Sequence, residues 1–206
     1  MNWLLAAAAP VVVGSVYLLT GFVHPAILAY HALCAVAVFR HRPRVRSLLR
    51  DGRSVAAWAL GATAVIVGAL LLAPLVQDPG PYRPLFRRTL LPWGRPELMF
   101  AIFAAYTMLV HAPLEEAFWR AVVMDPERTP VGRAMAHNAV FFYLIHAVPM
   151  ALILGAPGAL AAAPTFAAGA VWAFVTIRSR SLWPGLVSHW GADAAILGEM
   201  WFYFIR

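Results

Sequence analysis

Ionisable side chains interrupt three otherwise apolar stretches of this sequence. Glu115 and Glu116 are adjacent in the first stretch, His146 lies in the second, and His189 and Asp193 share the third. Carboxylates and imidazoles take protons from water near neutral pH, and a nearby donor can stabilise the oxyanion that forms when water attacks an amide. These residue types therefore indicate hydrolysis by an activated water molecule.

The spacing of residues within each stretch predicts different roles for the two glutamates. Residues four apart share one face of a helix, so Glu116 can pair with Arg120. Glu115 then lies about 100° around the helix and stays free to act. One arginine cannot balance two buried carboxylates, which argues against a purely structural doublet. The same spacing of four relates His189 to Asp193, and Phe142 to His146.

The composition indicates a membrane protein. Of 206 residues, 62% are hydrophobic and 12% are charged, whereas a soluble domain is roughly half apolar and a quarter charged. The formal net charge of +7 comes from arginine alone, and the arginines stand mostly between apolar segments. That is the pattern of membrane topology and not of nucleic-acid binding. The single cysteine, Cys34, excludes an intrachain disulfide and a cysteine-rich metal site.

About seven apolar stretches approach the roughly 20 residues that a membrane-spanning helix needs. Lipid excludes open sheets and exposed loops, so we predict an all-α, multi-pass transmembrane helix bundle. We expect one integral membrane domain over residues 1–206, with a motif-bearing catalytic core over about 98–206 and a tight connection between the first two spans. The predicted spans are Trp3–Phe22, His24–Phe39, Ser54–Val76, Leu98–Val123, Ala134–Gly155, Gly158–Ile177 and Leu182–Ile205.

Arginine placement predicts the orientation. The loop Arg40–Arg53 carries six arginines and should be cytoplasmic, with Met124–Arg133 and the pair Arg178 and Arg180 on the same side. Gln77–Pro96 should lie on the other side, yet it also holds four arginines among prolines and aromatics. We interpret it as an interfacial segment. The predicted location is the inner membrane of a bacterium.

Depth along the helices supports one shared site. At a rise of 1.5 Å per residue, Glu115 lies roughly 12 Å and His146 roughly 18 Å from the cytoplasmic ends of their spans. His189 and Asp193 lie roughly 10 to 16 Å deep. Three helices therefore bring their ionisable groups to one layer, on the cytoplasmic side of the midplane.

Taken in order, the patterns Glu-Glu-x-x-x-Arg at 115–120, Phe-x-x-x-His at 142–146 and His-x-x-x-Asp at 189–193 resemble the motifs of the CPBP family of intramembrane glutamic proteases, which includes the CAAX prenyl proteases. The lead-in Ser181–Pro184 is also similar. The resemblance covers about half of the chain. It implies that Glu115 is the general base, that His146 holds and activates the water, and that His189 and Asp193 stabilise the oxyanion. Glu116, Arg120 and Phe142 are supporting residues.

Asp193 departs from the family pattern, which often has asparagine at this position. An asparagine donates a hydrogen bond, whereas Asp193 donates only when protonated. It can instead orient His189 and favour the imidazolium form. We interpret His111, one turn before Glu115, as a residue that supports the site from outside the motifs or as a structural residue. The remaining histidines stand near span ends or in loops, and we assign them packing or interfacial roles: His24, His31, His41 and His137. Three tryptophans have the same roles: Trp183, Trp190 and Trp201.

Other functions fit the same residues. Two histidines with carboxylates can hold zinc with an open position for water, but no His-Glu-x-x-His run is present. We therefore favour metal-free chemistry without a cofactor, with zinc as the alternative. A non-catalytic immunity or scaffold protein is a second alternative. A proton-coupled transporter is a third, although the chain shows no internal repeat.

The expected partners are the lipid bilayer and a peptide or protein substrate within it, with no nucleic acid. The resemblance allows prenylated C-terminal peptides, leader peptides or C-terminal sorting tails. A chain without lysine is typical of a GC-rich bacterium, which favours maturation or sorting of exported proteins. The sequence leaves the oligomeric state open.

Overall fold

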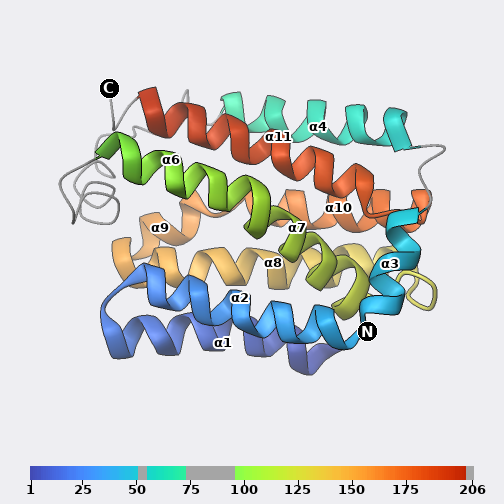
Figure 1. The fold of residues 1–206 in the computed structure, drawn as a ribbon, viewed down its shortest axis with the longest axis horizontal. Coiled ribbons are helices and arrows are strands. Elements are labelled where there is room, and N and C mark those ends of the chain that lie inside the picture. The colour runs from blue at the N-terminus through green and yellow to red at the C-terminus, as the bar shows by residue number, and fades with distance from the viewer. Residues whose placement is uncertain (51–54, 73–95, 203–206) are drawn as a thin grey trace.

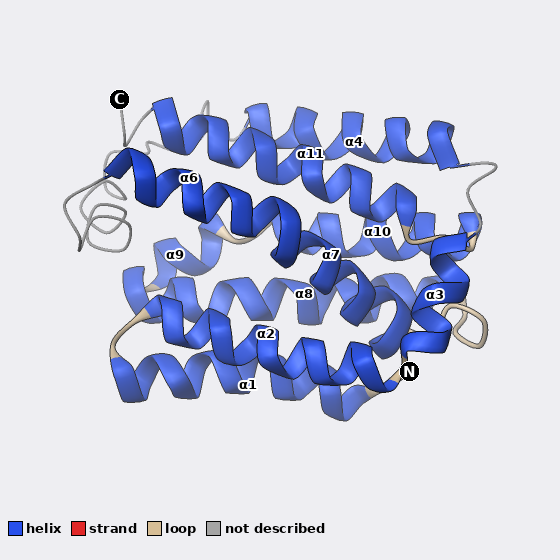
Figure 2. Cartoon of the chain, viewed as in Figure 1, coloured by secondary structure: helices blue, strands red, loops and turns tan. Residues whose placement is uncertain are grey.

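The computed structural model describes residues 1–50, 55–72 and 96–202. Over these ranges the chain consists of helices and short connections, without a strand (Figure 2). The helices pack side by side as a bundle (Figure 1), which confirms the all-α prediction. In chain order they are α1 (Trp3–Thr20), α2 (Val23–Arg40), α3 (Arg42–Arg50), α4 (Val55–Leu72), α6 (Pro96–Tyr106), η3 (Thr107–His111), α7 (Ala112–Glu116), η4 (Ala117–Val123), α8 (Val131–Leu154), α9 (Ala156–Ala161), α10 (Pro164–Ser179) and α11 (Trp183–Met200).

Among the described residues, five helical segments are long and apolar enough to cross a membrane: Trp3–Thr20, Val23–Arg40, Glu97–Val123, Val131–Leu154 and Ala156–Ser179. They correspond to five of the predicted spans. The chain is therefore a multi-pass membrane protein.

Two predicted spans are not among those five. The predicted span Ser54–Val76 lies partly outside the described residues, which show it as α4. Helix α11 is long enough but carries His189, Asp193 and Glu199, which lower its hydropathy. The count of seven spans stays a prediction. Of the predicted interfacial segment Gln77–Pro96, all but Pro96 lies outside the described residues.

The tight connection predicted between the first two spans depends on one glycine. Asn2 begins α1, since its side chain accepts a hydrogen bond from the amide of Leu5 at 3.2 Å. Gly21 ends α1 with a φ of 70°, in the left-handed region that favours glycine. Helix α2 begins two residues later and returns alongside α1, as Figure 1 shows.

The helical run from Pro96 to Val123 contains two π-helical segments, η3 and η4. Pro113 has no amide hydrogen, and its ring crowds the carbonyl one turn earlier. The preceding segment η3 is wound as a wider π-helix, and η4 is a second one. Trp190 of α11 donates from Nε1 to the carbonyl of Met108 in η3 at 2.7 Å. Insertions of this kind are frequent at functional sites, and here they flank the turn that carries Glu115 and Glu116.

The basic segments gather at one end of the bundle (Figure 1), as the arginine pattern predicted. Arg44 of α3 forms an ion pair with Asp125 at 3.1 Å. The amide of Leu182 donates to the carbonyl of Leu48 at 3.1 Å. These contacts join α3 to the connection after η4 and to the start of α11. The segment around α3, predicted as a loop, is helical because Val45 and Leu48 are buried on one face.

Candidate active site

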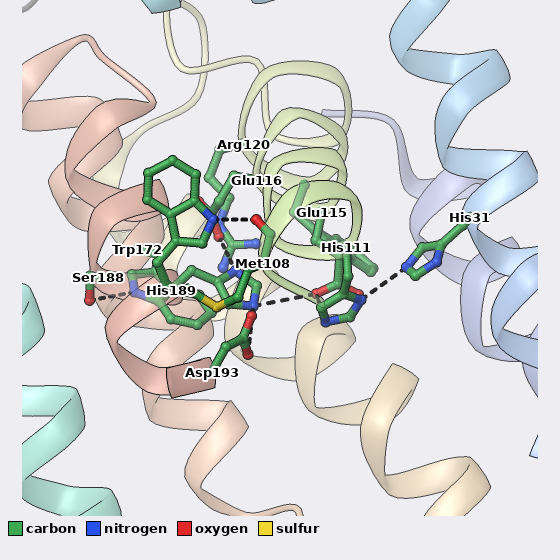
Figure 3. Close-up of polar contacts among 12 residues, drawn as sticks. His31, Met108, His111, Glu115, Glu116, Arg120, Trp172, Ser188, His189 and Asp193 are labelled. Carbon is green, nitrogen blue, oxygen red and sulfur yellow. Dashed lines mark hydrogen bonds and ion pairs between the residues drawn. The ribbon is translucent and has the colours of Figure 1, made fainter. Parts of the chain in front are cut away.

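Glu115 and Glu116 lie on α7, which packs against α2 on one side and α11 on the other. Both side chains are only 1% exposed. Their separation of about 100° on the helix gives each a partner of its own, although both approach His189. Glu116 approaches His189 and Arg120, whereas Oε2 of Glu115 lies 3.8 Å from Nε2 of His111 and 3.9 Å from Nε2 of His189. Figure 3 shows this arrangement around α7.

Glu116 and Arg120 form the predicted ion pair, with Nε of Arg120 3.5 Å from Oε2 of Glu116. Arg120 is fully buried, and its guanidinium lies 4.7 Å from the ring centre of Phe142 and 5.1 Å from that of Trp172. Aromatic faces attract a cation that has left water. Arg120 therefore supplies buried positive charge that offsets Glu116, and the Phe142 ring contacts its guanidinium.

The position of His189 is fixed on three sides. Its Nδ1 lies 3.0 Å from Oε1 of Glu116, and its ring stacks on Trp172 at 4.3 Å with an 18° angle between planes. A carboxylate can only accept, so Nδ1 carries the proton. Nε2 is turned to Glu115 and lies 3.8 Å from Oδ1 of Asp193. Glu116 thus makes the short orienting contact with His189, which the sequence interpretation had considered for Asp193.

His146 presents one nitrogen to the site. Its Nδ1 lies 2.8 Å from the carbonyl of Phe142. Because a carbonyl only accepts, Nδ1 carries the proton and Nε2 of the neutral ring is an acceptor. Among the described residues no hydrogen bond or ion pair joins His146 to Glu115. The two residues instead share the wall of one cavity, where a water molecule can interact with both.

Two histidines that the sequence interpretation left out belong to the site. His111, interpreted as a supporting or structural residue, faces Glu115. His31 was placed near a span end, and that was wrong: it is 5% exposed in the middle of α2. Its Nε2 lies 3.0 Å from Nδ1 of His111, and its Nδ1 hydrogen-bonds with the hydroxyl of Tyr106. The sequence signal for His31 was its place inside an apolar span, where ionisable residues are costly.

Two apolar cavities meet at the site. One of about 150 Å³ lies among α4, α8, α10 and α11 and reaches His189 and Asp193. The other, of about 210 Å³, lies among α1, α2 and α8 and reaches Glu115. His111 and His146 line both. Apolar pockets with a few convergent polar groups are the usual setting of a binding or catalytic site.

Among the described residues, two groups of three side chains could hold a metal ion. Within each group the three ligand atoms lie within 4.8 Å of one another. One is His31, His111 and Glu115, and the other is His111, His189 and Asp193. Two histidines and one carboxylate are a common zinc set. These triplets differ from the set suggested by the sequence, because they use His111 and omit His146 and Glu116.

The fold and the site define a multi-pass membrane protein with a buried carboxylate and histidine centre. Residues 97–195 match the family described as "Type II CAAX prenyl endopeptidase Rce1-like". This segment contains all three motifs and begins in α6. The match agrees with the resemblance to the CAAX protease family that the motifs indicated. Comparison with curated proteins finds no match, and comparison with solved structures finds none.

Proposed function

We propose that this protein is a glutamic-type intramembrane endopeptidase in which Glu115 and His146 activate the attacking water. The observation that carries the proposal is the environment of Glu115. Its side chain is 1% exposed, and Oε2 has no hydrogen-bond partner among the described residues. A buried carboxylate oxygen without a partner is costly, and a water molecule or a substrate group would satisfy it.

The proposed reaction uses these two side chains in two steps. Water interacts with Glu115 and with Nε2 of His146. Glu115 takes a proton from the water as its oxygen bonds to the carbonyl carbon of the peptide. When the tetrahedral intermediate collapses, the carbon–nitrogen bond breaks and the proton on Glu115 passes to the leaving amine. The products are a carboxylic acid and an amine.

His189 is the proposed donor to the oxyanion. Its Nδ1 is held by Glu116 at 3.0 Å, so the ring is oriented before the substrate arrives. Nε2, the nitrogen that would donate, is turned towards Glu115 and Asp193. A donor fixed in advance stabilises the developing charge without reorganisation.

The proposed substrate is a peptide or protein segment within the membrane. The cavities beside the site are lined mostly by apolar side chains, which suits a segment that leaves lipid. The basic end of the bundle supports a cytoplasmic location for that end in an inner membrane. The proposed role is the maturation or sorting of exported or membrane proteins.

The decisive experiment compares cells with the wild-type chain, Glu115→Gln or Glu97→Gln. Glu97 lies at the exposed start of the same helical run, so the control makes the same chemical change away from the site. Terminal-peptide mass spectrometry of membrane and secreted proteins should find cleaved termini with the wild type and Glu97→Gln. They should be absent with Glu115→Gln, although that variant inserts normally.

If Glu115→Gln processes its substrates at the wild-type rate, Glu115 is not the base. Termini that are the same in cells with and without the gene would favour the alternative, a non-catalytic immunity or scaffold protein of the same fold.

Zinc-dependent hydrolysis is a second candidate, favoured by the two triplets of ligand atoms. The purified protein would be treated exhaustively with a chelator and assayed before and after adding zinc. Full activity after chelation supports the metal-free mechanism. Loss of activity that zinc alone restores supports the zinc mechanism.

A further inference from the structure

Three side chains, those of Tyr106, His31 and His111, form a row that leads to the proposed base, Glu115. The hydroxyl of Tyr106 contacts Nδ1 of His31, and Nε2 of His31 lies 3.0 Å from Nδ1 of His111. Nε2 of His111 in turn lies 3.8 Å from Oε2 of Glu115. Figure 3 shows His31 reaching across to His111 on the side of Glu115 away from His189. His31 lies outside the segment 97–195 that matches the protease family.

The carboxylate of Glu115 determines which nitrogen donates and which accepts in each hydrogen bond of this row. Glu115 can only accept, so Nε2 of a neutral His111 does best as a donor, and its Nδ1 is then an acceptor. Nε2 of His31 must therefore donate, and its Nδ1 accepts from the hydroxyl of Tyr106. The reverse order would turn the lone pair of His111 towards a buried anion, where low dielectric makes the repulsion costly.

Ring contacts and hydrogen bonds hold the three side chains of this row in place. The rings of His31 and Tyr106 have centres 5.5 Å apart, and those of His31 and His111 are 5.0 Å apart. Tyr30, the neighbour of His31, accepts a hydrogen bond from Nε1 of Trp119 at 2.8 Å. Helix α2 is thereby tied to the helical run that carries Glu115, both before α7 at Tyr106 and after it at Trp119.

We propose that His31 is a positioning residue that holds His111 in the tautomer that donates towards Glu115. The inference rests on the proposed function of Glu115 and adds a residue from the N-terminal helices to that site. His31 acts on the base only through His111. Losing it lets the His111 ring rotate and exchange tautomers, so the carboxylate loses a fixed neighbour.

The first test measures the tautomer directly. The full chain, with ¹⁵N-labelled histidine, is studied in phospholipid bilayers by solid-state NMR, and His111→Gln identifies the His111 signals. We expect His111 to carry its proton on Nε2 in the wild type and to show a mixture in His31→Ala. Unchanged His111 signals in His31→Ala, or a proton on Nδ1 in the wild type, would overturn the proposal.

The second test measures turnover of a peptide copied from a terminus that the wild-type protein generates. Orienting partners of functional histidines are typically worth about 10- to 100-fold, so His31→Ala should lower kcat by about that factor with little change in KM. His31→Gln, whose amide can both accept and donate, should recover part of the loss. The control is His24→Ala, an exposed histidine two turns earlier on the same helix.

The outcomes separate this inference from the function on which it rests. If Glu115→Gln is inactive and both His31 variants turn over as the wild type does, the positioning role is wrong and the proposed base stands. If Glu115→Gln is active, the proposed function fails whatever the His31 variants do. A His31→Ala protein that does not fold leaves His31→Gln and the wild-type NMR signals to decide the question.

Discussion

Glu116 accepts a hydrogen bond from Nδ1 of His189 at 3.0 Å, across the contact between α7 and α11. This relationship gives the second glutamate of the doublet two tasks, because the same carboxylate is also paired with Arg120. It fixes the tautomer of His189 and it balances a buried cation. Glu115, its neighbour in sequence, is the proposed base.

Replacing Glu116 should separate these two tasks. Glu116→Gln keeps a carbonyl oxygen that can accept from His189, whereas Glu116→Ala removes it. Both leave Arg120 without its carboxylate. We therefore expect both variants to be less stable than the wild type, and Glu116→Ala to have the lower kcat. Thermal unfolding in detergent and steady-state kinetics would measure the two effects. Equal kcat values for the two variants would argue against an orienting contact.

Substitutions of the two partners of the buried ion pair should have strongly non-additive effects on the free energy of unfolding. Removing one partner of such a pair typically costs about 3–5 kcal/mol, because the other charge stays buried and uncompensated. Arg120→Met should therefore destabilise the protein by an amount of that order. Adding Glu116→Gln to it should cost little more, or recover stability. A double-mutant cycle on the unfolding free energy in mild denaturant measures this coupling. Simple additivity would mean that the pair contributes nothing.

Gly185 should be intolerant of a methyl group. A Cβ at this position would lie 2.5 Å from Oε2 of Glu116, so Gly185→Ala should push the carboxylate away from Arg120 and His189. We expect lower activity and a lower melting temperature.

Gly198 provides the matched control on the same helix, because a Cβ there meets no described atom within 4 Å. Alanine is favoured over glycine inside a helix by about 0.5–1 kcal/mol, so Gly198→Ala should be neutral or slightly stabilising. Wild-type activity in both variants would contradict the close approach of α11 to Glu116.

Asp193 can be tested with the residue that the family often has at this position. Oδ1 of Asp193 lies 3.8 Å from Nε2 of His189, and Oδ2 has no hydrogen-bond partner among the described residues. If the side chain donates to the oxyanion, Asp193→Asn should retain activity and Asp193→Ala should lose about 100-fold or more in kcat. Kinetics on both variants would measure this. An inactive Asp193→Asn would indicate that the negative charge beside His189 is what matters.

The sequence by itself determined what depends on composition and on the period of one helix. The excess of apolar residues required a membrane bundle, because too few polar side chains are available to cover a water-facing surface. The spacing of four between Glu116 and Arg120 predicted their pairing, since helical geometry alone brings such residues together. The three motifs also placed Glu115, His146 and His189 in one region, and the structure brings His189 to Glu115.

Only the tertiary structure decided which partners meet across helices. The rotation of α11 about its axis turns Nδ1 of His189 to Glu116 and leaves Asp193 at 3.8 Å from Nε2. The packing of α2 brings His31 within 3.0 Å of His111. No periodicity within one helix contains this information, because the contact depends on how two side-chain surfaces interlock. Glu115, His146 and His189 could therefore be found from the sequence, whereas the contact of His31 with His111 required the packed bundle.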